Sequence, residues 1–402
     1  MKTPFKAVKV TDSIYWVGAI DWNIKDFHGY ATDSGTTYNA YLVLADKITL
    51  VDTVKAPFRD EMISRIASVV DPKNISVIIS NHSEMDHTGC LPEVINLIAP
   101  DHVYASKMGL KAIKNHFHSD CGITVVEDGS TVSLGDRDIS FIETRMLHWP
   151  DSMFSYLPGE SFLFSQDAFG MHLASCERFA DEIDSFVLEF EGAKYFANIL
   201  MPYSKFITKL LERIGALNLD IKHIAPDHGP VWRNAENIRH VVGLYKKWAE
   251  QKPAPKAVIT YDTMWQSTDK MARAIADGLA GSGIQVKLMS LQSYHRSDIA
   301  TELLDSGAFV VGSPTLNNNV FPTIADAMVY LKGLKPVNLI GAAFGSYGWS
   351  GESIKHLENM LDEMKVDRVV ESVKCEYIPD NDTLESCNDL GKRIAEKLKQ
   401  IC

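Results

Sequence analysis

The segment Asn81–Gly89 places two imidazoles and two carboxylates in six consecutive positions, directly after the apolar run Val77–Ile79. A strand that ends here would deliver these four side chains to a pair of metal ions. Every second residue of an extended chain points to the same side, so the side chains of His82, Glu84 and Asp86 converge. His87 can join them only if the chain turns. A polar surface turn with helix-capping carboxylates is the alternative, because short motifs also occur by chance.

Three further potential ligands, His148, Asp167 and His228, follow at long spacing, each just after a strand-like run. Ligands that are scattered through one domain but placed at strand ends are what a rigid sheet with functional loops provides. Taken singly, such a histidine is more often a surface or core residue, and such an aspartate is a turn former. All seven together offer nitrogen and oxygen donors, a mixture that suits iron better than the sulfur-rich donor sets of structural zinc sites.

The order of these ligands resembles that of the metallo-β-lactamase fold, and the loop with a glutamate at position 84 resembles the flavodiiron proteins (class A, two-domain) in particular. Zinc hydrolases of this fold usually carry histidine where this chain has Glu84, and a harder anionic oxygen donor is consistent with iron. The resemblance covers the whole chain and implies two non-haem irons. It implies that one iron is held by His82, Glu84 and His148 and the other by Asp86, His87 and His228, with Asp167 bridging them. His87 can join this set only if the backbone twists after Asp86, because neighbouring side chains of an extended chain point apart.

The second half of the chain carries an independent signal of different chemistry. The run Ala257–Tyr261 is typical of a buried parallel strand, and the hydroxyl-rich segment Asp262–Thr268 leads from it into the helical run Lys270–Leu279. Backbone N–H groups at a helix start, with hydroxyl groups beside them, can surround a phosphate monoester without a metal or a lysine. Ordinary N-capping of the helix by serine or threonine is the alternative.

Two later segments, Ala308–Asn317 and Leu339–Gly351, also run from a buried strand into a small, polar, glycine-rich loop. Three such loops at the intervals of βαβ units resemble flavodoxin, in which the ligand lies at the carboxyl ends of the strands. The resemblance implies FMN, with its phosphate on residues 263–268, its ring edge near residues 314–317 and Trp349 against the isoalloxazine. Alternatively the aromatic residues of these loops belong to the core, although rings in polar loops favour a flat ligand to stack on. The residues expected to bind FMN are Thr263, Met264, Trp265, Gln266, Ser267, Thr268, Pro314, Thr315, Leu316, Asn317, Ser346, Tyr347, Gly348, Trp349 and Ser350.

At 402 residues the chain exceeds the size at which a single core stops growing, so two domains are expected. The segment Gln251–Lys256 alternates proline and charge after the helix-like stretch Ala235–Glu250, as a linker does. We therefore predict an α/β protein with a metallo-β-lactamase-like αββα sandwich over residues 1–252 and a flavodoxin-like doubly wound parallel sheet over residues 253–402.

The net charge of −12 argues against nucleic-acid binding, which usually requires a basic patch. No run approaches the ~20 apolar residues of a membrane span, and the first ten residues lack the apolar core of a signal peptide, so we expect a cytoplasmic protein. The six cysteines form no C-x-x-C pair and are expected to be reduced thiols. They also provide no ligands for a fused rubredoxin, so the electron donor is expected to be a separate rubredoxin or a similar small carrier.

The two sites together predict a redox reaction that neither supports alone. FMN accepts single electrons and stores two, and a carboxylate-bridged di-iron pair binds a small oxidant between its metals. The family resemblance therefore implies an oxidoreductase that passes electrons from reduced rubredoxin through FMN to the di-iron site and reduces dioxygen to water, with nitric oxide reduction to nitrous oxide as well. It further implies a head-to-tail homodimer, or a dimer of such dimers, in which the FMN of one subunit meets the di-iron site of its partner. Asp52, His28 and Tyr195 are candidates to orient the ligands.

Two other functions fit parts of the pattern. One is a zinc hydrolase of the lactamase fold with an attached flavodoxin, against which Glu84 and the seven-ligand set argue. The other is an electron-transfer flavoprotein with a vestigial metal site, against which the completeness of the ligand set argues. The sequence leaves the preference between dioxygen and nitric oxide open, and we predict dioxygen because the single-flavin, two-domain form resembles the oxygen-reducing members of the family.

Overall fold

The computed structural model describes residues 4–402, which form two compact units. The first unit consists of Thr32–Tyr195, Lys205–Lys246 and the described residues up to His28. The second unit consists of Lys247–Cys402 together with the short segments Gly29–Ala31 and Phe196–Ser204. The domain boundary that we predict between residues 252 and 253 stays a prediction.

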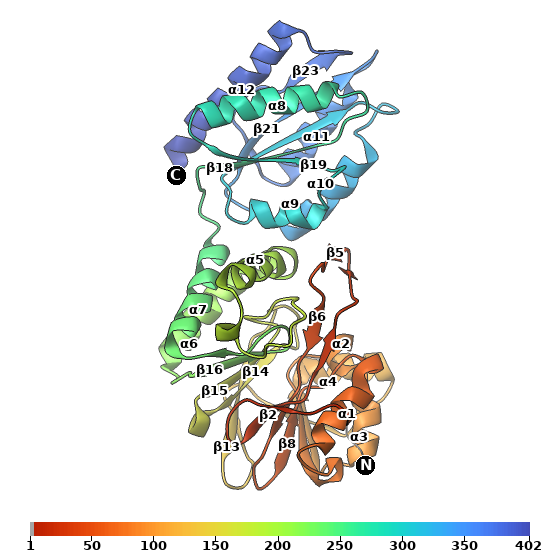
Figure 1. Ribbon diagram of the computed structural model, residues 1–402, viewed down its shortest axis with the longest axis vertical. Helices are drawn as coiled ribbons and strands as arrows, with labels where there is room; N and C mark the ends of the chain where they lie inside the picture. Colours follow the sequence, from red (N-terminus) through yellow and green to blue (C-terminus); the bar gives the residue numbers. More distant parts are fainter. Residues whose placement is uncertain (1–3) are drawn as a thin grey trace. The chain divides into compact units, whose positions relative to one another are not determined.

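The first unit is a sandwich of two mixed sheets with helices on its outer faces, which confirms the predicted αββα architecture (Figure 1). One sheet has seven strands and the other has six. In sheet order the seven are β1 (Val8–Lys9), β2 (Ile14–Trp16), β7 (Tyr41–Val43), β8 (Ile48–Val51), β9 (Ile75–Ser80), β10 (His102–Ser106) and β11 (Ile123–Val126). The six are β12 (Thr131–Ser133), β13 (Asp138–Glu143), β14 (Met153–Leu157), β15 (Phe162–Gln166), β16 (His223–Pro226) and β17 (Trp232–Arg233).

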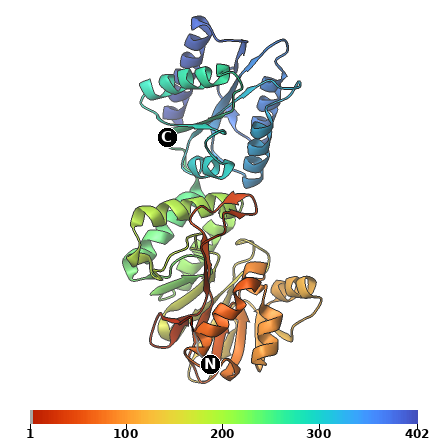
Figure 2. The ribbon, with the colours of Figure 1, turned by 45° about the vertical axis from the view of Figure 1, so that its right-hand side comes forward.

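The helices of the first unit fall into two groups, one against each sheet (Figure 2). The larger sheet is covered by α1 (Arg59–Ala67), α3 (Leu91–Ile98) and α4 (Lys107–Phe117), whose buried apolar residues form one cluster with that sheet. The second group is α5 (Ser185–Tyr195), α6 (Ser204–Leu217) and α7 (Ala235–Glu250). The unit also contains a short antiparallel pair, β3 (Ala19–Asp21) and β6 (Thr36–Tyr38).

The alternation of side chains along β9 explains why this strand lies in the middle of the sandwich. Val77 and Ile79 belong to the core between the two sheets, whereas Ile78 belongs to the core between the larger sheet and its helices. Successive residues of a strand point to opposite faces, so a run that is apolar at every position must be covered on both. Large aromatic rings fill the space between the sheets, and Tyr41 and Phe164 lie 5.4 Å apart from centroid to centroid.

Three strands of this sandwich end within two residues of a candidate metal ligand. β15 and β16 are parallel, and Gln166 pairs with Pro226 at their carboxyl ends. This register brings the residues that follow, Asp167 and His228, to the same edge of the sheet. The ends of β9, β15 and β16 precede His82, Asp167 and His228 respectively.

The second unit is a parallel sheet with helices on both faces, which confirms the predicted doubly wound fold (Figure 1). The strand order is β19 (Gln285–Ser290), β18 (Lys256–Tyr261), β20 (Ala308–Pro314), β21 (Ile340–Tyr347) and β22 (Asp367–Arg368), and β23 (Val373–Glu376) also pairs with β21. The chain order reverses between β18 and β20, where such folds bind their ligands. One face carries α8 (Ser267–Gly281) and α12 (Asn381–Ile401), and the other carries α9 (Arg296–Leu303), α10 (Pro322–Leu334) and α11 (Glu352–Glu363).

The two helices on the first of these faces approach each other closely through glycine. A Cβ atom on Gly391 of α12 would lie 2.3 Å from the carbonyl oxygen of Ile275, and one on Gly278 of α8 would lie 2.0 Å from the carbonyl oxygen of Asn388. Each clash would be with backbone, which cannot move aside as a flexible side chain can. Close packing of α8 on α12 therefore depends on both glycines.

We expect Gly391→Ala to lower the free energy of unfolding of the second unit by about 1–3 kcal/mol, because the added methyl group forces the two helices apart. Gly281→Ala is the matched control, since this glycine also lies in α8 and no heavy atom lies within 4 Å of the position of its Cβ. Urea unfolding followed by circular dichroism measures both. Equal stability of the two variants would contradict this account of the packing.

Candidate metal centre and flavin pocket

The loop after β9 changes from an extended chain to a helical turn, and this change brings its polar side chains together. Glu84 has an extended backbone, with φ −62° and ψ 149°, and the short helix α2 (Met85–Thr88) follows it. The hydroxyl of Thr88 donates to the carbonyl oxygens of Ser83 and Glu84, both at 2.9 Å, which fixes the turn. This turn is the condition under which His87 can join the residues before it.

The structure brings all seven candidate ligands together in two adjoining clusters. The first cluster is His82, Glu84, His148 and Asp167, and the second is Asp86, His87 and His228. Within each cluster the potential ligand atoms lie within 4.8 Å of one another. All of these side chains are buried except that of His148, which is half-buried.

Asp167 faces both clusters at once. Its Oδ2 atom lies 2.9 Å from Nε2 of His148 and 3.3 Å from Nε2 of His82. Its Oδ1 atom lies 3.2 Å from Nε2 of His87 and 3.4 Å from Nε2 of His228. One oxygen is thus directed to each cluster, as in a carboxylate that bridges two metal ions.

Several polar atoms at the centre of the site are buried without a hydrogen bond. Among the residues that the structure describes, these include both carboxylate oxygens of Asp86, both ring nitrogens of His87 and Oδ1 of Asp167. A buried polar group without a partner costs about 1–3 kcal/mol, so a cluster of them calls for something that the protein itself does not supply. Two metal ions would engage these atoms, and the donor set therefore fits a di-iron centre.

The electrostatics of the site favour positive charge at its centre. Burial raises the pKa of Glu84, but hydrogen bonds from His148 and His28 outweigh burial and hold this pKa well below its ordinary value. Burial lowers the pKa of His87, but nearby carboxylates, Asp86 first among them, raise it to about 10. In the absence of metal, protons on His82, His87 and His148 offset the carboxylate charge. A metal cation takes over this role when the imidazoles bind it in their neutral form.

Asp151 orients one of the candidate ligands, and the sequence analysis missed it. Its Oδ2 atom accepts hydrogen bonds from Nδ1 of His82 at 3.1 Å, from the backbone N–H of Ser83 at 2.7 Å and from the Ser83 hydroxyl at 2.6 Å. These bonds leave Nε2 of His82 free to face the first cluster, the arrangement by which carboxylates orient metal-bound histidines. The only signal in the sequence is an acid three residues after His148, which is too common to stand out.

The three side chains that we expected to orient the ligands have different surroundings. Nε2 of His28 lies 3.2 Å from Oε1 of Glu84, so His28 contacts a candidate ligand directly. The ring of Tyr195 lies 6.1 Å from that of His228. Asp52 accepts hydrogen bonds from the backbone and side-chain nitrogens of Asn81, at 2.7 and 2.8 Å, and so holds the start of the ligand loop.

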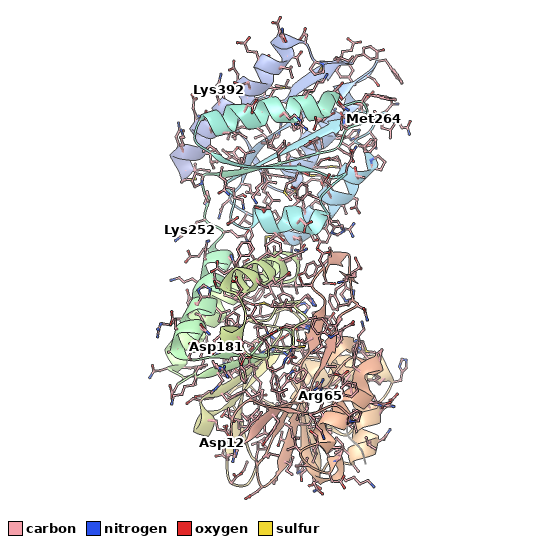
Figure 3. All side chains as sticks on the ribbon, in the orientation of Figure 1. Asp12, Arg65, Asp181, Lys252, Met264 and Lys392 are labelled. Carbon is pink, nitrogen blue, oxygen red and sulfur yellow. The ribbon has the colours of Figure 1, made fainter. Side chains whose placement is uncertain are left out.

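The second unit contains a cavity of about 1020 Å³ at the carboxyl ends of its strands. Most of the expected FMN-binding residues line it, and Met264, labelled in Figure 3, lies in the loop that leads into α8. Trp265 and Trp349 border this cavity, and these residues are 89% and 88% exposed. Large apolar rings in solvent beside a cavity indicate a binding site. The lining residues are Met264, Trp265, Ser267, Pro314, Thr315, Leu316, Asn317, Asn318, Ser346, Tyr347, Gly348, Trp349, Ser350, Tyr377 and Ile378.

Three expected residues do not line this cavity. The Thr268 hydroxyl forms a hydrogen bond with that of Ser346 at 3.0 Å, which ties the loop after β18 to the loop after β21. Thr263 has a buried hydroxyl without a hydrogen bond, and Gln266 is the residue before α8, with a positive φ of 65°.

Three lining residues were missed by the sequence analysis: Asn318, Tyr377 and Ile378. Tyr377 and Ile378 follow β23 and are 62% and 70% exposed. An apolar pair just after a strand was the signal that could have revealed them.

Comparisons with known proteins agree with this division. Residues 36–229 match the family described as ODP family beta lactamase, and residues 259–391 match flavodoxin. The chain is 46% identical to a nitric oxide reductase of Moorella thermoacetica, with 97% of this chain and 98% of that protein covered. Among solved structures it is similar to the rubredoxin oxygen:oxidoreductase of Desulfovibrio gigas, with 46% identity, a TM-score of 0.97 and 98% and 99% of the two chains covered. It is also similar to the flavodiiron protein of Giardia intestinalis, with 32% identity, a TM-score of 0.94 and 99% and 98% covered.

We expect Asp151→Ala to weaken iron binding about 10- to 100-fold, because His82 then loses the acceptor that orients its ring. Asp220→Ala is the matched control: this exposed aspartate also accepts a serine hydroxyl, that of Ser161 at 2.7 Å, but belongs to neither cluster. Iron retained by each variant during dialysis against a graded chelator series gives the comparison. If both variants keep iron equally well, Asp151 has no role in orienting the ligand.

Proposed function

Because the chain belongs to the flavodiiron family, we propose that it is a reductase that passes electrons from a reduced rubredoxin or similar small carrier, through FMN, to a di-iron site where dioxygen is reduced to water. The observation that carries this proposal is the placement of Asp167, which offers one carboxylate oxygen to each of two ligand clusters. A relative and a solved structure that are each 46% identical to this chain are named as reductases of nitric oxide and of oxygen.

The residues that would hold the irons divide as the two clusters do. His82, Glu84 and His148 would hold one, Asp86, His87 and His228 the other, and Asp167 both. When bound, the iron pair and FMN supply two electrons each, which matches the four needed to convert dioxygen fully to water.

The surrounding protein fixes these side chains and keeps bulk water from them. Asp151 orients His82, and the backbone carbonyl of Thr37 accepts a hydrogen bond from Nδ1 of His228 at 2.6 Å. Fixed ligand rings leave little rearrangement for the reaction itself, and burial strengthens the electrostatic interactions within the site.

The FMN site follows from the cavity of the second unit. We place the isoalloxazine ring among the residues that line this cavity, against Trp349, and the phosphate on the loop formed by residues 263–268. Thr263 and Thr268 supply hydroxyls there, and the start of α8 supplies backbone N–H groups, which together suit an anion.

Nitric oxide is the second substrate that we propose, because the relative from Moorella thermoacetica is named for its reduction. Reduction of two nitric oxide molecules by two electrons and two protons gives one nitrous oxide and one water. A zinc hydrolase and a flavoprotein with a vestigial metal site both lose support, since the relatives are oxidoreductases and the ligand set is complete.

We also propose a cytoplasmic location and a head-to-tail homodimer. All six cysteines are free thiols, as expected in a reducing compartment. None of the helices in residues 4–402 combines the length and apolar character needed to cross a bilayer. A twofold dimer in which the FMN of one subunit meets the di-iron site of its partner makes two such contacts at once.

We expect Asp167→Ala and His228→Ala each to lose iron and oxidase turnover while FMN stays bound, because each removes a ligand from the metal clusters. His240→Ala is the control, since His240 lies on α7 beside Glu189 and belongs to neither cluster. Metal and flavin analysis, followed by anaerobic stopped-flow oxidation with dioxygen and separately with nitric oxide, measures the effect. Retained iron with retained turnover in both variants would overturn the ligand assignment, and zinc without turnover in the unaltered protein would overturn the function.

The head-to-tail dimer predicts that a variant defective in FMN binding and a variant without iron regain activity when their subunits are combined. We expect Trp349→Ala to weaken FMN binding without loss of iron, because Trp349 borders the cavity of the second unit. We expect a mixture of this variant with the iron-free His228→Ala protein to recover about a quarter of the unaltered activity after subunit exchange. Half of the dimers are then mixed, and each mixed dimer contains one complete pair of sites instead of two. Flavin content of the re-separated Trp349→Ala chains controls for FMN transfer. Absence of recovery in dimers shown to have exchanged would contradict the head-to-tail arrangement.

A further inference from the structure

Two side chains form hydrogen bonds with the main chain of Thr263, a residue of the proposed phosphate loop. The backbone N–H of Thr263 donates to Oδ1 of Asp262 at 2.6 Å, and its carbonyl accepts from Nε2 of Gln292 at 2.8 Å. The same Nε2 of Gln292 donates to Oδ1 of Asp262 at 2.9 Å. The start of the loop is therefore fixed by a small closed network rather than by the loop alone.

Asp262 connects three separate segments through this network. It is the first residue after β18, it binds Gln292 from the segment between β19 and α9, and its Oδ2 accepts the hydroxyl of Thr323 in the first turn of α10. A carboxylate near a helix N-terminus is favoured by the helix dipole. Hydrogen bonds to an ionised acceptor are also about twice as strong as neutral ones.

The charge of Asp262 cannot itself attract the ligand. Asp262 is 2% exposed, and its partners among residues 4–402 are Thr263, Gln292 and Thr323, none of which carries a positive charge. A buried negative charge beside a phosphate site opposes phosphate binding through space. Asp262 can therefore help phosphate binding only by fixing the positions of the groups that donate hydrogen bonds to it.

The hydroxyl of Thr263 shows what this positioning is for. It is buried and forms no hydrogen bond with any described residue. Buried hydroxyls are nearly always paired, so an acceptor is missing here. The main-chain N–H of Thr263 is already taken by Asp262, which leaves the hydroxyl as the group of this residue that can donate to a phosphate oxygen.

We propose that Asp262 and Gln292 are positioning residues for the FMN phosphate: they hold the main chain of Thr263 so that its hydroxyl meets a phosphate oxygen, without touching the ligand themselves. This inference rests on the proposed FMN site. It separates two parts of the site, because the network holds the main chain of Thr263, which does not line the ring cavity. Loss of the network therefore affects FMN but not riboflavin, which has the same ring and no phosphate.

The test is a titration of the full-length apoprotein with FMN and, separately, with riboflavin, followed by quenching of flavin fluorescence. We expect Asp262→Ala to weaken FMN binding by about tenfold or more, the scale of losing hydrogen bonds to a charged group, while riboflavin binding changes less than about twofold. Gln292→Ala should show the same selectivity with a smaller loss. Because Gln292 is exposed, its replacement does not threaten folding.

Two further variants sharpen the comparison. Asp262→Asn keeps an oxygen that accepts from Thr263 and Gln292, and its amide nitrogen donates to the Thr323 hydroxyl, so FMN affinity should stay within about threefold of the unaltered protein. Gln285→Ala replaces an exposed glutamine in the neighbouring strand β19 and should leave both affinities unchanged. Iron content and near-UV circular dichroism report on folding in every variant.

A loss selective for FMN in Asp262→Ala and Gln292→Ala, with rescue by Asp262→Asn, supports the inference. Unchanged FMN affinity in the two alanine variants would overturn it and leave the proposed function intact. Equal losses of FMN and riboflavin would also overturn it, since the residues would then support the whole pocket. An unaltered protein that bound neither flavin would remove the proposed function along with the inference.

Discussion

The rest of the structure depends on one electrostatic constraint, the concentration of three carboxylates and four imidazoles in a site that is almost entirely buried. Polar groups removed from water are costly unless they are hydrogen-bonded, and within the described residues the side chains of Asp86 and His87 and Oδ1 of Asp167 have no hydrogen bond. Metal ions resolve this conflict. The first unit is best understood as a rigid frame that holds these groups together in spite of the cost.

The frame does so through strand register. Gln166 and Pro226 pair at the ends of two parallel strands, so the residues that follow them are neighbours although 60 positions separate them in the chain. β9 lies between two apolar layers, and its pairing with β8 and β10 fixes its register. The packing of the sandwich therefore sets the positions of the candidate ligands. Polar contacts such as that of Asp151 with His82 then fix the orientation of their side chains.

The second unit uses the same plan for a different ligand. Its cavity lies at the carboxyl ends of parallel strands and is bordered by exposed aromatic rings that no protein core covers. A flat redox cofactor would explain both features, and we propose that its phosphate meets the buried Thr263 hydroxyl. Both units thus contain groups that no protein contact satisfies. In the first unit these are potential metal ligands, and in the second they are exposed aromatic rings and the Thr263 hydroxyl.

The sequence by itself determined the fold class of both units, because strand and helix periodicity are local properties of the chain. The residues that form the two metal clusters followed from the resemblance of their order to that of a known family. The sequence also identified most of the residues that line the cavity of the second unit. It did not reveal Asp151, Tyr377 and Ile378, whose roles depend on which distant segments they meet. Nor did it show that Thr263 and Thr268 lie outside the cavity, with Thr268 bonded to Ser346. The geometry of Asp167, which faces both clusters, agrees with the bridging position that the family resemblance implies. The tertiary structure alone decided that Asp262 joins three segments, since this depends on the packing of strands and helices far apart in the chain.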